Sequence, residues 1–155
     1  MKFYWIKTNW LIKKIFSNYT WDFPNAGNSN TVYRTFDDGP IPEVTEWVLD
    51  ELKKYNVKAT FFCIWDNIDK NPEIFKKVIS EGHSIGNHAF NHLNGRKTPT
   101  ETYIENTKRC EETIQKNSSY NLKSTLFRPP YGKIKASQSK KIRELGYKII
   151  MWDVL

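Results

Sequence analysis

The chain has 155 residues, with 24 Lys and Arg against 17 Asp and Glu, so its formal net charge is +7. The positive charge is spread along the sequence, which favours an anionic environment but does not by itself indicate a nucleic-acid partner. Apolar residues make up 39% and charged residues 26%, which suits one globular domain and excludes a charge-rich disordered chain. Two cysteines, Cys63 and Cys110, are too few for a disulfide-stapled scaffold.

The N-terminal segment Met1–Phe16 mixes basic and apolar residues. Lys7, Thr8 and Asn9 interrupt its apolar run and no small-residue cleavage site follows. We therefore expect no standard signal peptide and, by default, a cytoplasmic protein, with the localisation otherwise open. We expect this segment to form a short helix packed on the domain, with a basic amphipathic helix that contacts a membrane surface as the alternative. No stretch reaches the ~18 consecutive apolar residues of a membrane span.

The remaining sequence alternates strand patterns with helix patterns. Asn25–Asn30 is predicted as a loop, so residues 1–30 form an N-terminal extension and residues 31–155 one domain. Continuous apolar, β-branched and aromatic runs predict strands at Thr31–Phe36, Ala59–Ile64, His83–Gly86, Thr125–Phe127 and Tyr147–Val154. Apolar residues at helical spacing predict helices at Glu43–Tyr55, Pro72–Glu81, Thr100–Lys116 and Ala136–Leu145.

This order of elements predicts an α/β fold. Strands of continuous apolar character are buried on both faces, which favours a parallel sheet covered by helices. Such a sheet is either an open doubly wound sheet or a (β/α) barrel, and in both the active site lies at the carboxyl ends of the strands. Reactive side chains at those ends are therefore the candidates for a functional site.

Two adjacent carboxylates, Asp37 and Asp38, follow the first predicted strand in the sequence TFDDGP. Turn chemistry explains Gly39 and Pro40 but not a pair of carboxylates directly after an apolar strand. Because side chains alternate between faces along a regular strand, both carboxylates can reach one site only where the strand breaks into its turn.

The three histidines of the chain fall within ten residues, at His83, His88 and His92. The spacing of His88 and His92 can place two imidazoles on one metal ion, whereas His83 is expected to be structural. One Asp with two His makes a three-ligand site with an open position, and the second Asp can act as a general base on a water activated by the metal. This composition predicts metal-assisted hydrolysis of an acyl bond.

The segment RPPYG begins with Arg128 directly after a predicted strand. Arg128 can pair with a carboxylate through two parallel hydrogen bonds. The two prolines stiffen the loop, which would hold the backbone N–H of Tyr131 fixed as an oxyanion donor requires.

Three motifs in this order, TFDDGP at Thr35–Pro40, HAFNH at His88–His92 and RPPYG at Arg128–Gly132, resemble those of the polysaccharide deacetylases (NodB homology domain, carbohydrate esterase family 4). MWDVL at Met151–Leu155 is similar to the start of a fourth motif. The resemblance implies a distorted (β/α) barrel of the glycoside hydrolase/deacetylase type. It also implies removal of acetyl groups from N-acetylated sugars of the chitooligosaccharide or peptidoglycan type.

The resemblance implies a role for each candidate residue. Asp37 would be the catalytic base, oriented by Arg128, and the Tyr131 N–H would help hold the oxyanion. Asp38, His88 and His92 would bind a divalent metal, zinc in the first place, with cobalt or nickel as alternatives.

The sequence departs from the family pattern in two respects that bear on activity. Ala89 stands where the second motif usually has Ser or Thr. The family's general-acid histidine would lie past Leu155, so the barrel is expected to be incomplete at its C-terminus. Two alternatives therefore stand beside the deacetylase: a catalytically crippled fragment that binds metal and carbohydrate, and a metal-dependent amidase acting on a small non-sugar amide.

Overall fold

The computed structural model describes residues 6–23, 31–118 and 125–154, and the predicted loop Asn25–Asn30 lies outside them. Its centre is a five-stranded sheet with the order β1-β2-β3-β4-β5, in which every pair of neighbours is parallel. The strands are β1 (Thr35–Gly39), β2 (Thr60–Cys63), β3 (Ser84–Asn87), β4 (Leu126–Phe127) and β5 (Lys148–Ile149).

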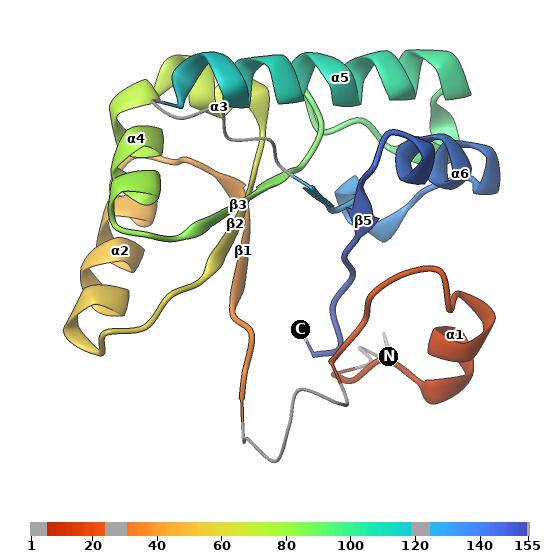
Figure 1. Ribbon diagram of the computed structural model, residues 1–155, viewed down its shortest axis with the longest axis horizontal. Helices are drawn as coiled ribbons and strands as arrows, with labels where there is room; N and C mark the ends of the chain where they lie inside the picture. The colour runs from red at the N-terminus through yellow and green to blue at the C-terminus, as the bar shows by residue number, and fades with distance from the viewer. Residues whose placement is uncertain (1–5, 24–30, 119–124, 155) are drawn as a thin grey trace, which may run out of the picture.

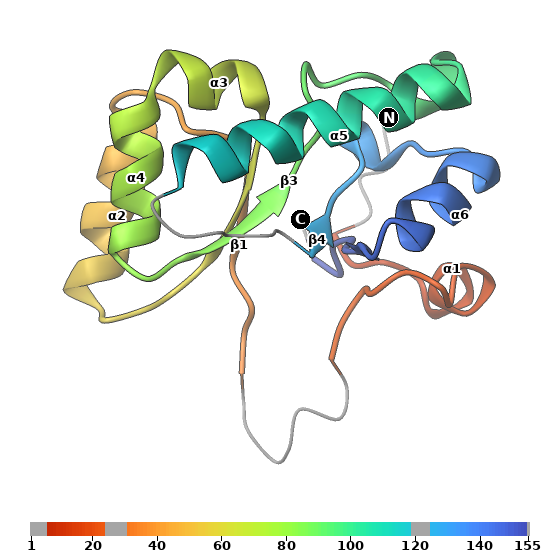
Figure 2. The same cartoon turned by 45° about the horizontal axis from the view of Figure 1, so that its top comes forward.

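The helices α2 to α6 form an arc around the outside of these strands (Figure 1, Figure 2). Consecutive strands that are also neighbours, with helices wrapped outside them, make the arrangement of a (β/α) barrel, whereas a doubly wound sheet reverses its strand order. The predicted α/β class and barrel type are confirmed. The helices are α1 (Trp10–Ile15), α2 (Val44–Lys54), α3 (Trp65–Lys70), α4 (Pro72–Ser80), α5 (Thr100–Asn117) and α6 (Ala136–Glu144), with 3₁₀ turns η1 (Gly95–Lys97) and η2 (Pro130–Gly132).

The first and last strands differ from their predicted ranges. β1 begins at Thr35, where its register with β2 begins, and Val32 before it is 82% exposed. β5 ends at Ile149, and Ile150 forms an isolated bridge with Thr20 instead. A β-branched and aromatic composition favours extended backbone, but a strand exists only where a neighbouring strand accepts its hydrogen bonds.

The N-terminal segment lies along the chain that follows β5. The Thr20 N–H donates to the Ile149 carbonyl at 2.8 Å, and the Met151 N–H donates to the Thr20 carbonyl at 2.8 Å. Tyr19 and Trp21 pack against the apolar cluster beneath α5 and α6, whereas α1 buries none of its side chains. The expectation of a packed helix is therefore wrong for α1, because the residues after it provide the packing. In the described ranges no helix combines the length and apolar character needed to cross a bilayer.

Two apolar clusters hold the helices against the sheet. The first lies beneath α2 to α5, with Leu49, Phe61, Ile68, Phe75 and Ile114 at its centre, and the second contains Tyr103, Phe127, Ile142 and Ile149. Cys63 and Cys110 are buried free thiols in the first cluster. Burial raises the pKa of both thiols, so they remain protonated and act as packing groups.

Helix α3 was absent from the sequence expectations because it is short and follows β2 without a Gly or Pro boundary. Its single fully buried side chain, Ile68, gives no periodic signal. The first backbone N–H groups of α3, those of Trp65 and Asp66, donate to the carbonyls of Ala89 and Phe90 at 3.4 and 3.3 Å. The helix start therefore supports the turn between the two histidines of the second motif.

His83 lies just before β3, at the opposite end of that strand from His88, and its Nδ1 accepts a hydrogen bond from the Ala59 N–H at 3.2 Å. Burial lowers the pKa of His83, so the unfolded chain, with an ordinary pKa of about 6.5, binds the proton more readily. This contribution to stability is complete above pH ~6.5 and is lost as the pH falls through the folded-state pKa.

We therefore expect the free energy of unfolding to fall more steeply between pH 7.5 and pH 5 in the wild type than in His83→Gln. Urea denaturation of the metal-free proteins at several pH values measures the two slopes. Gln retains an acceptor for the Ala59 N–H and does not titrate, so equal slopes would show that His83 does not contribute.

Candidate metal centre

Asp37 and Asp38 both belong to β1, and a bulge at Asp38 changes the direction of its side chain. Asp37 pairs with Phe62 and Gly39 pairs with Cys63, so Asp38 is an extra residue in the strand, with a φ of 65°. A bulge re-aims a side chain that would otherwise point to the opposite face. The two carboxylates therefore reach one region because the regular strand breaks at Asp38, where the sequence placed the break. The break is a bulge next to the last residue of β1 rather than the turn that follows it.

His88 follows β3 and is 2% exposed. Its Nδ1 lies 2.7 Å from the Arg128 carbonyl oxygen. Because a carbonyl oxygen only accepts, Nδ1 carries the proton and the lone pair on Nε2 is left to face Asp38. Burial lowers the pKa of His88, which favours the neutral ring that binds a metal ion.

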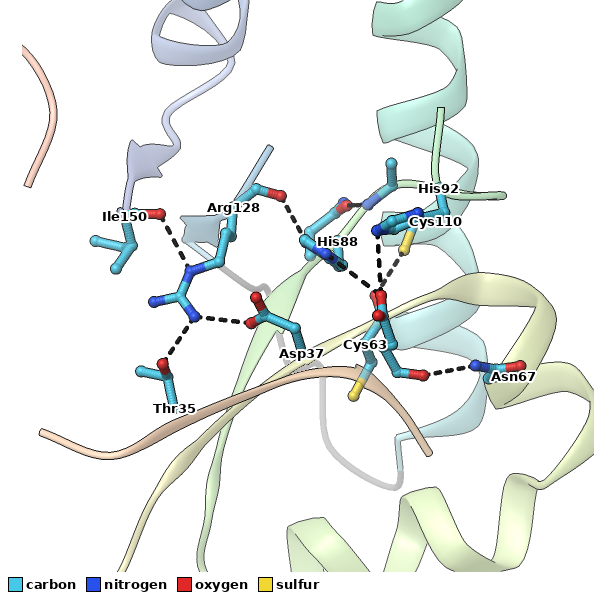
Figure 3. A network of polar contacts seen from close by, with 12 residues as sticks. Thr35, Asp37, Cys63, Asn67, His88, His92, Cys110, Arg128 and Ile150 are labelled. Atoms are coloured by element: carbon cyan, nitrogen blue, oxygen red, sulfur yellow. Dashed lines mark hydrogen bonds and ion pairs between the residues drawn. The ribbon is translucent and has the colours of Figure 1, made fainter. Parts of the chain in front are cut away.

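Asp38, His88 and His92 converge on one point, as the close view in Figure 3 shows for the two imidazoles. Asp38 Oδ1 lies 3.5 Å from His88 Nε2 and 3.2 Å from His92 Nε2, and all three donor atoms lie within 4.8 Å of one another. Asp38 Oδ1 is buried and has no hydrogen-bond partner among the described residues. A buried carboxylate oxygen facing two imidazole nitrogens is a donor set that a divalent cation satisfies.

Arg128 connects Asp37 in β1 to the chain that follows β5, the strand at the opposite edge of the sheet. Its Nη1 donates to Asp37 Oδ1 and to Thr35 Oγ1, both at 2.7 Å. Its Nη2 and Nε donate to the carbonyls of Met151 at 3.1 Å and Ile150 at 3.3 Å. Burial lowers the pKa of the guanidinium and the Asp37 carboxylate opposes that effect. Arg128 at the end of β4 thus joins β1 to the chain after β5, with Asp37 between Arg128 and His88 (Figure 3).

Tyr131 covers one side of His92. The two rings meet edge to face with centroids 4.4 Å apart, and the Tyr131 side chain is 57% exposed. Tyr131 has a φ of 59°, and positive φ values also occur at Asp38, Ala89 and His92 around the same centre. Non-glycine residues with positive φ are uncommon, and such strained backbone concentrates at functional sites.

Three asparagines that were not among the predicted site residues support the metal centre. Asn67 Nδ2 donates to the Asp38 carbonyl at 2.6 Å, and Asn106 Oδ1 accepts from the Phe90 N–H at 2.8 Å. Asn87 Oδ1 accepts from the Ala89 N–H at 2.8 Å. The position of Asn87 directly before His88 was a usable signal, whereas Asn67 and Asn106 lie outside the motifs.

Comparison with known proteins gives consistent matches. The polysaccharide deacetylase family model matches residues 24–150. A peptidoglycan-N-acetylglucosamine deacetylase of Bacillus cereus is 39% identical over 150 residues, covering 97% of this chain and 52% of that protein. The peptidoglycan-N-acetylglucosamine deacetylase PgdA of Listeria monocytogenes is 35% identical over 133 residues, covering 86% of this chain and 28% of that protein.

A solved structure gives the same relationship in three dimensions. It is the Bc1960 peptidoglycan N-acetylglucosamine deacetylase in complex with 4-naphthalen-1-yl-N-oxidanyl-benzamide. The TM-score is 0.83 at 36% sequence identity, covering 94% of this chain and 65% of that one. The chain thus spans about half the length of the Bacillus cereus relative, at 52%, and about two thirds of the solved chain, at 65%.

Proposed function

Because this chain belongs to the polysaccharide deacetylase family, we propose that it acts in metal-dependent removal of acetyl groups from N-acetylated sugars. The observation that carries the proposal is the buried Asp38 Oδ1, which has no hydrogen-bond partner among the described residues and faces the Nε2 atoms of His88 and His92. The relatives named above are peptidoglycan deacetylases, which favours peptidoglycan N-acetylglucosamine as the substrate, with chitooligosaccharides as the related alternative.

The proposed roles follow from the chemistry of the side chains. Asp38, His88 and His92 hold a divalent ion, with zinc proposed first and cobalt or nickel as alternatives. When bound, such an ion supplies Lewis-acid activation of a water and of the acyl oxygen. Asp37, kept in place by Arg128, takes the proton of the attacking water as general base. The Tyr131 N–H, in the stiff loop after Pro129 and Pro130, donates to the developing oxyanion.

The N-terminal residues have a separate proposed role. We propose residues 31–155 as the catalytic domain and residues 1–30 as an extension; the family match begins at residue 24, close to that division. Trp10 is 69% exposed on α1, and Lys14 lies over its ring. Exposed aromatic and basic side chains on one short helix support contact with a membrane surface.

The function is tested by measuring acetate release from N-acetylglucosamine oligomers and from peptidoglycan. We expect release by protein loaded with zinc, cobalt or nickel and none after treatment with a chelator. Small non-sugar amides serve as the comparison substrates. Release from those amides alone would support the amidase alternative, and metal binding without release from any substrate would support the crippled fragment.

A further inference from the structure

The fully buried side chain of Asn87, at the end of β3, connects three parts of the fold. Its Nδ2 donates to the Thr107 carbonyl in α5 at 2.9 Å and to Tyr147 Oη at 3.2 Å. Its Oδ1 accepts from the Ala89 N–H at 2.8 Å, in the turn between His88 and His92. The amide therefore links the histidine turn to α5 and to the chain just before β5.

The hydroxyl of Tyr147 continues this chain of hydrogen bonds. Tyr147 is 8% exposed, and its Oη donates to Glu111 Oε2 at 2.9 Å. Burial and the Glu111 carboxylate raise the pKa of Tyr147, so the hydroxyl keeps its proton. Because that proton is directed to Glu111, Tyr147 Oη can only accept from Asn87.

The partners of Asn87 leave its amide one orientation. The Thr107 carbonyl accepts and cannot donate, and Tyr147 Oη accepts because its proton goes to Glu111. Both acceptors require the NH₂ end of the amide, so the oxygen must face the Ala89 N–H, which only donates. The three contacts are mutually consistent, and reversing the amide would leave three buried polar contacts unsatisfied.

The Ala89 backbone needs this support. Ala89 has a φ of 68° and is fully buried, and its N–H belongs to the peptide plane that joins it to His88. Positive φ in a residue other than glycine is strained and persists only where the surroundings hold it. A contact that fixes the Ala89 N–H therefore fixes the peptide plane from which His88 projects on one side and His92 follows on the other.

We propose that Asn87 is a positioning residue for the metal centre, and that Tyr147 and Glu111 determine the orientation of its amide. The geometry of His88 and His92 then depends on the hydroxyl of Tyr147, which lies just before β5. This inference rests on the proposed function, because that geometry matters only when the histidines hold a metal ion. Asn87 hydrogen-bonds to neither imidazole and acts through the backbone of the turn that carries them. The loss of an outer group that orients metal ligands typically weakens metal binding about 10–100-fold.

The test compares Tyr147→Phe with Tyr103→Phe. Both tyrosines are buried and meet Phe127 edge to face, with centroid distances of 6.1 and 6.2 Å. Tyr103 Oη has no hydrogen-bond partner among the described residues, so Tyr103→Phe removes a buried hydroxyl outside the network. Calorimetric titration with Zn²⁺ and Co²⁺ gives the affinity, and the visible spectrum of the Co²⁺ form reports ligand geometry.

We expect Tyr147→Phe to bind either metal about 10-fold more weakly, with an altered Co²⁺ spectrum, and Tyr103→Phe to match the wild type. Amide hydrogen exchange in the metal-free proteins provides a second readout, in which the Ala89 amide exchanges faster only in Tyr147→Phe. Glu111→Ala, which removes the acceptor of the Tyr147 hydroxyl, provides the same two readouts if Tyr147→Phe does not fold.

The outcomes separate the two proposals. A wild-type chain that binds no Zn²⁺ or Co²⁺ would overturn the proposed function. A wild type that binds metal, together with a folded network variant whose affinity, Co²⁺ spectrum and Ala89 exchange are all unchanged, would overturn the positioning role alone.

Discussion

Replacing Asp37 with Asn should reduce the rate of acetate release about 10²–10⁴-fold, the usual contribution of a general base, and leave metal affinity nearly unchanged. The Asp37 carboxylate pairs with Arg128 at 2.7 Å and is not one of the three converging donors. Asn preserves the shape and can accept the Arg128 hydrogen bond, but it cannot take a proton from water at neutral pH. Steady-state assays with metal titration of the same preparation measure both quantities.

Asp38→Asn provides the matched control, because it makes the same chemical change one residue away. It removes the charged donor that faces His88 and His92, so both metal affinity and acetate release should fall together. If Asp37→Asn lost its metal and Asp38→Asn kept it, the two carboxylates would have to exchange roles.

Replacing Arg128 with Ala should lower the free energy of unfolding by about 3 kcal/mol, at the low end of the range for a broken buried ion pair. Arg128 is 3% exposed, and its guanidinium lies 4.1 Å from the Phe62 ring centroid. The Asp37 side chain is 33% exposed, so water partly compensates for its lost partner. The carbonyls of Ile150 and Met151 would also lose a charged donor.

Urea denaturation of the metal-free protein measures this loss. Arg143→Ala, an exposed position on α6, should change the free energy of unfolding by no more than about 0.5 kcal/mol. Equal unfolding midpoints for Arg128→Ala and Arg143→Ala would mean that Arg128 does not join β1 to the chain after β5.

Elements whose signal is local were predicted well from the sequence. Predicted and observed bounds agree within one residue for α2, α4, α5 and α6. The signal that predicts a helix is the spacing of apolar residues three or four positions apart, so it lies within the helix itself. The ends of β1 and β5 were misplaced because pairing with β2 and with Thr20 involves residues distant in sequence.

The sequence by itself determined which chemical groups are available and in what order: two carboxylates, two histidines four residues apart, and an arginine after a later strand. These groups follow from residue identity and were sufficient to predict the candidate ligands, whereas the alternation of strand and helix patterns predicted the α/β fold. The tertiary structure alone decided how the groups meet. The bulge at Asp38, the positive φ of Ala89 and the orientation of the Asn87 amide each depend on contacts with other elements: β2, α5 and the chain before β5. Strained backbone and buried amides hold one geometry only when distant partners impose it, and a local sequence pattern does not encode those partners.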